Sequence, residues 1–144
     1  MSHEQPDDRG ANGERLIFRN TMKITPGHLD EYRKAIVEAV EFAEHHAPQL
    51  MVDVFIDEEQ LTATSFQIYA DSAAVLRHWE LSDPYIANVM KHCKVVAFEA
   101  FGEPSDDVRA GLGRTPEMPV KVLPRLTGYL KPIGEQTVHA GKTS

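Results

Sequence analysis

Apolar residues recur along this chain at two alternating spacings, and this pattern limits the possible folds more than any other feature. Between Leu16 and Ile24 they occupy every second position, which predicts a strand with one buried face. After Thr25 and Pro26, an N-cap residue and a proline suited to the first helical position, they recur every three or four residues to about Ala47. This spacing predicts a helix. The later segments continue the alternation, with strands predicted at 50–56, 61–69 and 95–101, helical segments at 72–79 and 85–90, and a short helix at 106–112.

The order of the predicted elements, β-α-β-β-α-β, indicates an α+β fold. Its simplest packing is a ferredoxin-like, four-stranded antiparallel sheet with both helices on one face. The second helical region is expected in two parts, because Ser82, Asp83 and Pro84 interrupt it. The strands at 50–56 and 61–69 carry more apolar residues than one layer of helices can cover. We therefore expect a homodimer in which two sheets pack face to face.

Composition and charge narrow the classes of function. The 144 residues are 42% hydrophobic and 26% charged, as expected of one globular domain, predicted at 15–112 between a disordered arm at 1–14 and an extension at 113–144. The net charge of −7 has the wrong sign for binding nucleic acid or an anionic membrane surface. Cys93 has no second cysteine to pair with, and no signal peptide or membrane span is recognisable, so a cytoplasmic protein is expected.

Asn20 is the polar residue that breaks the apolar alternation of the first strand. An amide on a buried strand face costs roughly 1–3 kcal/mol unless it is hydrogen-bonded. Asn20 is therefore expected either to bond a neighbouring backbone group or to face a pocket and its ligand. Two positions are also open for Trp79. Its helical spacing with Val75 and Leu76 suits packing in the core as well as lining a pocket.

His78 and His92 are candidate general bases, since imidazole titrates near neutral pH. A solvent-exposed position without a catalytic role is the alternative for His78. His45 and His46 fall in the last turn of the first predicted helix, where positive charge complements the helix dipole. No set of His, Asp and Glu has the spacing of a metal site, so no metal is predicted.

Three segments carry a resemblance to a known family: Pro26-Gly27 after the first strand, Tyr69-Ala70-Asp71 after the third, and the run Leu76-Arg77-His78-Trp79-Glu80-Leu81-Ser82-Asp83-Pro84-Tyr85. They resemble the antibiotic biosynthesis monooxygenase family of dimeric α+β barrels, over residues 15–103. The resemblance implies a homodimeric oxygenase without a cofactor, in which a phenol or quinol is deprotonated in a closed apolar pocket and reacts directly with dioxygen. It also implies Asn20 and Trp79 as pocket donors, with His92, His78 or Tyr85 as the base.

Tyr32 and Tyr85 are expected to face the space between the helices and the sheet. Each would bring a hydroxyl into an apolar environment, which suits a phenolic or quinone-like substrate. Core packing with a tethered hydroxyl is the alternative for both residues.

A local resemblance to the haem-degrading monooxygenases of the same superfamily provides an alternative. Asn20 matches their strand asparagine, and Trp79 matches their tryptophan three residues before a Ser-Asp pair. Their iron-ligating histidine falls on Val89, which would line the same pocket but cannot bind iron. His92, one helical turn further on, would have to replace it. Haem binding or degradation is thus an alternative function, as is a non-oxidative protein that binds or isomerises a small ligand.

The segment from Pro119 to Ile133 interleaves apolar residues with lysine, arginine and proline. Its prolines prevent a long helix, and a solvated tail would rarely carry so many apolar side chains. The net charge is +3 over residues 113–144 and −7 over residues 15–112. We therefore expect an ordered arm that docks on the acidic domain, crossing to the other protomer.

Overall fold

The structure, a computed structural model, describes residues 14–113, 118 and 120–131. These residues form a single sheet with three helices. In chain order the elements are β1 (Leu16–Ile24), α1 (Leu29–His46), β2 (Gln49–Asp57), β3 (Thr62–Tyr69), α2 (Ser72–Met90), β4 (Cys93–Phe101), α3 (Asp106–Leu112) and β5 (Val120–Leu123).

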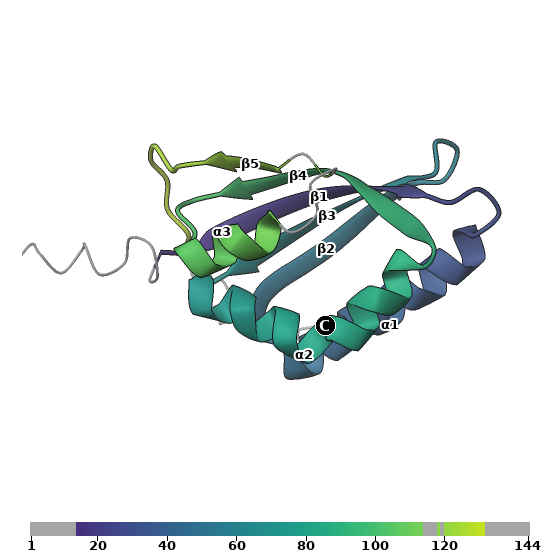
Figure 1. The fold of residues 1–144 in the computed structure, drawn as a ribbon, viewed down its shortest axis with the longest axis horizontal. Helices are drawn as coiled ribbons and strands as arrows, with labels where there is room; N and C mark the ends of the chain where they lie inside the picture. The colour runs from purple at the N-terminus through teal and green to yellow at the C-terminus, as the bar shows by residue number, and fades with distance from the viewer. Residues whose placement is uncertain (1–13, 114–117, 119, 132–144) are drawn as a thin grey trace, which may run out of the picture.

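The sheet has the strand order β2-β3-β1-β4-β5, with β1 at its centre (Figure 1). The first four strands pair antiparallel, as the ferredoxin-like prediction requires. The prediction of a four-stranded sheet was wrong, because β5 adds a fifth strand, parallel to β4. Val120 and Val122 of β5 pack against the core, which explains why this segment joins the sheet.

Both long helices cover the same face of the sheet (Figure 1). The β1 residues that point toward them are Leu16, Phe18, Met22 and Ile24, all buried. Each end of the sheet has its own apolar cluster, one around Phe18 and Tyr69 and the other around Met22 and Tyr32. Asn20 lies on β1 between these two clusters, so the space beside it is less tightly filled by apolar side chains.

The opposite sheet face carries no helix among the described residues (Figure 1). Phe55 and Phe66 lie there with ring centroids 6.0 Å apart, and Phe55 is 58% exposed. Arg19 on the same face pairs with Glu99 at 3.0 Å. This face therefore combines aromatic and charged groups, and the homodimer expected to use it stays a prediction.

Two helix boundaries differ from the prediction. Helix α1 begins at Leu29 rather than near Pro26, because Gly27 adopts a φ of +86° and His28 donates its backbone N–H to the Thr25 carbonyl in a turn. Helix α2 is continuous where an interruption was expected. Pro84 is exposed within it, so the Glu80 carbonyl that loses its helical partner lies on the side that water can reach.

The part of the C-terminal arm that follows β5 lies at the surface. Arg125 pairs with Glu14 at 2.8 Å, while Leu126 is 95% exposed. The predicted crossing of the C-terminal arm to a second protomer stays a prediction. Of the N-terminal arm predicted at 1–14, residues 1–13 lie outside the described residues. Across the ranges that the structure covers, no helix combines the length and apolar character that crossing a membrane requires.

Candidate functional site

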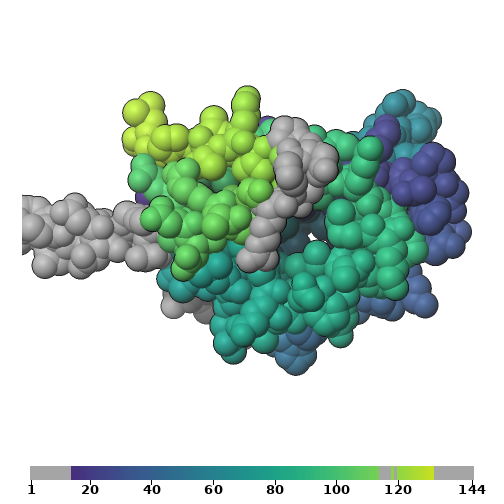
Figure 2. All heavy atoms as spheres, in the orientation of Figure 1, coloured from purple at the N-terminus to yellow at the C-terminus, as the bar shows by residue number. Residues whose placement is uncertain are grey.

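A cavity of about 110 Å³ lies between the sheet and the two long helices. Figure 2 shows the molecular surface hollowed beside the green atoms of α2. The sheet supplies four polar side chains of the cavity wall, and the helices supply two more, His78 and Ser82, with most of the apolar ones. The lining residues are Asn20, Met22, Ile36, Ala39, Val40, Ala43, Gln49, Val52, Val54, Ser65, Gln67, His78, Ser82, Ile86, Val89 and Met90.

Helical spacing explains how α1 and α2 form this wall. His78, Ser82 and Ile86 follow one another at four-residue steps, so they share one face of α2. On α1, Ala39 and Ala43 are also four residues apart and face the cavity. Because alanine side chains are short, they leave space between α1 and the sheet where larger residues would fill it.

The Asn20 side chain is the most informative group in the cavity. Its Oδ1 atom is buried and has no hydrogen-bond partner among the described residues. An unpaired buried carbonyl costs roughly 1–3 kcal/mol. This placement favours the ligand-facing role over the alternative that the amide is satisfied by the backbone.

Gln49 provides a second unpaired acceptor, because its Oε1 is also buried and no described residue bonds it. Its Nε2 donates to Gln67 Oε1 at 3.1 Å and to the Tyr69 hydroxyl at 2.9 Å. Tyr69 donates to Gln67 Oε1 at 2.5 Å, and Gln67 Nε2 donates to Ser65 Oγ at 3.2 Å. These side chains form a continuous polar row on the helix-facing side of β2 and β3.

His78 faces this row from α2. Its Nδ1 lies 3.0 Å from Ser82 Oγ, and burial lowers the pKa of His78 to about 4. The imidazole is therefore neutral near pH 7, with Nε2 as the ring nitrogen that Ser82 does not engage. A neutral imidazole can accept a proton in the cavity, although its lowered pKa makes it a weak base.

The cavity wall carries no full charge near neutral pH. None of the described residues that line it is Asp, Glu, Lys or Arg, and its histidine is neutral. Burying an ionised ligand without a compensating charge is strongly unfavourable. The site therefore suits a neutral molecule with an apolar body and hydrogen-bond donors.

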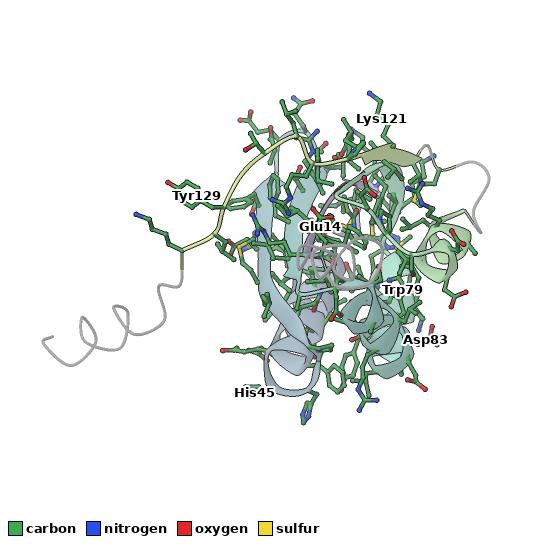
Figure 3. The ribbon with its side chains drawn as sticks, turned by 90° about the vertical axis from the view of Figure 1, so that its left-hand side faces the viewer. Glu14, His45, Trp79, Asp83, Lys121 and Tyr129 are labelled. Carbon is green, nitrogen blue, oxygen red and sulfur yellow. The ribbon has the colours of Figure 1, made fainter. Side chains whose placement is uncertain are left out.

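Trp79 does not line this cavity. Figure 3 shows it beside α3, and a Cβ added at Gly111 of α3 would overlap its indole ring. The ring packs on the cluster around Phe18. The structure thus places Asn20 and Trp79 in different surroundings, and the role of Trp79 as a pocket donor stays a prediction.

The two predicted substrate-binding tyrosines also lie away from the cavity. Tyr32 is fully buried in the cluster around Met22, and its hydroxyl contacts Met22 Sδ at 3.6 Å. Burial raises the pKa of Tyr32. Tyr85 stacks on Phe42 with ring centroids 4.4 Å apart, on the outer side of the helix pair. Tyr32 also lines a separate groove between α1 and β2, so the substrate-binding role of both tyrosines stays a prediction.

The residues that a haem would need do not fit that group. Val89 lines the cavity at the position of the expected iron ligand and has no donor atom. His92 does not line the cavity, and its Nδ1 lies 3.1 Å from Nδ1 of His28. Within the described part of the chain, no cluster of three or more His, Cys, Asp or Glu residues is arranged to hold a metal ion.

Sequence reasoning missed Gln49, Ser65, Gln67 and the bond between His78 and Ser82. Ser65 and Gln67 alternate with buried Ala63 along β3, so the signal that identified Asn20 was present there too. Gln49 had no such signal, because a bulge lies between it and Met51.

Comparisons with known proteins identify a fold. No protein-family model and no curated protein sequence matches the chain. Among solved structures, MupZ from Pseudomonas fluorescens superposes with a TM-score of 0.70 over 83% of this chain and 96% of its own, at 14% identity.

Two other neighbours cover a smaller share of the chain. A Caulobacter crescentus protein named as a candidate antibiotic biosynthesis monooxygenase has a TM-score of 0.56 and 16% identity, over 67% of this chain and 94% of its own. SnoaB, a cofactor-independent oxygenase from Streptomyces nogalater, has a TM-score of 0.54 and 11% identity, over 61% and 91%. The chain therefore has an antibiotic biosynthesis monooxygenase-like fold, as its sequence motifs predicted.

Proposed function

We propose that the protein is an oxygenase that works without a cofactor on a small, neutral phenol or quinol bound in the cavity. The observation that carries this proposal is the unpaired Asn20 Oδ1 at the wall of an uncharged, largely apolar cavity. A phenolic hydroxyl supplies the donor that this acceptor lacks. The fold shared with SnoaB supports the reaction class.

The proposed chemistry begins with proton transfer from the substrate hydroxyl to Nε2 of the neutral His78. Because no hydrogen bond holds Asn20 Oδ1, the amide is free to turn and present its N–H to the phenolate oxygen that forms. Such a donor, together with exclusion of water, offsets the low basicity of the imidazole. Ser82 Oγ, bonded to Nδ1, keeps the ring oriented.

The electron-rich ring carbon then forms a bond to dioxygen. The resulting peroxide takes up the transferred proton, and its O–O bond breaks as the second substrate hydrogen leaves with one oxygen as water. The other oxygen remains as a quinone carbonyl. The substrate loses two hydrogens and gains one oxygen, so no external reductant is needed.

A non-oxidative proton-transfer enzyme, such as an isomerase, is the second candidate. It is favoured by the neutral His78 imidazole in the wall of the uncharged cavity, since a proton acceptor there can serve proton transfer without dioxygen. The same His78 and Asn20 would serve it, without the step that uses dioxygen.

Oxygen uptake with a panel of phenols and hydroquinones tests the proposal. Asn20→Ala is expected to lower turnover by about 100-fold, the order of magnitude for losing one oxyanion-stabilising donor. Asn88→Ala is the matched control, since Asn88 does not line the cavity. Equal turnover in the two variants would remove Asn20 from the mechanism, and substrate conversion under argon would favour the isomerase.

A further inference from the structure

We propose that Gln49 is a second recognition residue and that the cavity selects a ligand donating two hydrogen bonds, one to Asn20 Oδ1 and one to Gln49 Oε1. This inference rests on the proposed function only in using the same cavity. It requires the ligand to carry a second hydrogen-bond donor. The oxygenase chemistry does not need one, because a substrate with a single hydroxyl would suffice for it.

A β-bulge directs Gln49 into the cavity. Gln49 pairs with Tyr69 while Met51 pairs with Ile68, so Leu50 is an extra residue in β2. The extra residue reverses the alternation of side chains, which places Gln49 on the same face as Val52 and leaves Leu50 60% exposed. Without the bulge, Gln49 and Val52 would point to opposite faces of the sheet.

Hydrogen-bond lengths determine which end of the Gln49 amide faces the ligand. The 2.5 Å contact between the Tyr69 hydroxyl and Gln67 suits an O–H···O bond and is short for N–H···O, so the Gln67 atom in this contact is the oxygen. That oxygen also receives the Gln49 amide at 3.1 Å, so the Gln49 atom facing it must be a donor. Turning Gln49 around would set two acceptor oxygens against each other.

Gln49 therefore donates from Nε2 within the protein, and its acceptor Oε1 has no partner among the described residues. Gln67 Oε1 and the Tyr69 hydroxyl lie only 2.5 Å apart on the same side of Nε2, so they share one amide hydrogen. Tyr69 is fully buried, and Ser65 anchors the other end of the row through Gln67. Tyr69 and Gln67 act as positioning residues that hold Oε1 of Gln49 toward the cavity.

The chemistry of the ligand follows from these two acceptors. A hydroxyl or N–H group opposite each carbonyl would satisfy it, whereas a carboxylate or ketone opposite the fixed Gln49 Oε1 would face an acceptor with another acceptor. The absence of charged side chains among the described lining residues also disfavours an ionised ligand. The class that fits is a neutral diol, of which a dihydroxyaromatic compound is the simplest example.

Binding of resorcinol, its monomethyl ether and its dimethyl ether, measured by NMR titration of the intact protein, tests this inference. We expect resorcinol to bind roughly two- to tenfold more tightly than the monomethyl ether, the usual range for one hydrogen bond. In Gln49→Leu the two compounds should bind within twofold of each other, because the second hydroxyl no longer has an acceptor.

Two further variants separate recognition from folding. Tyr69→Phe keeps the buried ring and removes the hydroxyl that holds Gln49, so it should reduce the same affinity ratio while the monomethyl ether binds as before. Gln60→Leu changes an exposed glutamine in the β2–β3 turn and should leave the ratio unchanged.

The outcomes distinguish this inference from the proposed function. An unchanged ratio in Gln49→Leu would overturn the role of Gln49, even if oxygen uptake depends on Asn20. Tighter binding of resorcinol than of its monomethyl ether, lost in Gln49→Leu, would support the role of Gln49, even if no phenol is oxidised. If catechol, resorcinol and hydroquinone all bind no better than their monomethyl ethers, the requirement for two donors is wrong.

Discussion

Asn20 and Gln49 each bury a carbonyl oxygen that has no partner in the described part of the chain, yet only Asn20 could be predicted from the sequence. Asn20 interrupts a regular apolar alternation, so its amide stands out on the buried face of β1. Gln49 precedes a bulge. Strict alternation of side chains along the strand would instead place Leu50 on the same face as Val52. The side-chain bonds that orient Gln49 depend on β2 and β3 being paired, which the spacing of residues in one strand does not reveal.

His78 yields a prediction about pH and stability. Burial lowers its pKa from 6.5 to about 4, so between these values the unfolded chain binds more protons than the folded one. The stability due to the neutral imidazole is fully present above about pH 6.5 and is lost as the pH falls toward 4. Urea unfolding at pH 7 and pH 5 measures the free energy of unfolding at each pH. Its decrease from pH 7 to pH 5 should be smaller in His78→Gln than in the parent protein. Equal losses in the two proteins would show that His78 is not held neutral by burial.

At the scale of the elements, the spacing of apolar residues located most strands and helices. The bounds of β1 and α3 agree with the prediction, because both follow a regular pattern and α3 has a Ser105 side chain that caps its N-terminus. The continuous α2 did not follow from the sequence. Pro84 is a helix breaker by its local preference, but on the exposed side of a helix whose other side is packed, that preference is overridden.

The contact between α2 and α3 is tested by Gly111→Ala. A Cβ at this position would overlap the Trp79 ring, so the substitution should lower the free energy of unfolding by about 1–3 kcal/mol despite the better helix propensity of alanine. Gly113→Ala is the control, since its Cβ would meet no atom closer than 3.6 Å. Urea denaturation measures the free energy of unfolding of both variants. A Gly111→Ala protein as stable as the control would mean that α3 does not pack on the indole as described.

At the scale of the whole molecule, the exposed sheet face leads to a prediction about assembly. Phe55 and Phe66 form an aromatic pair there, and burying it against a second copy would remove apolar surface from water. Light scattering at micromolar concentration should give twice the 16.1 kDa of the chain, and Phe55→Glu should reduce this to the monomer mass. Val37→Glu, which adds the same charge to an exposed position on α1, should leave the dimer intact. A monomeric parent protein would contradict this account.

The cavity between the sheet and the two long helices is the proposed ligand site. NMR titration with resorcinol, observed through the methyl groups of isoleucine and valine, tests it most directly. We expect the shifts to concentrate on Ile86 and Val89, which line the cavity. Shifts confined to Val37 and Ile56, which line the outer groove between α1 and β2, would contradict it.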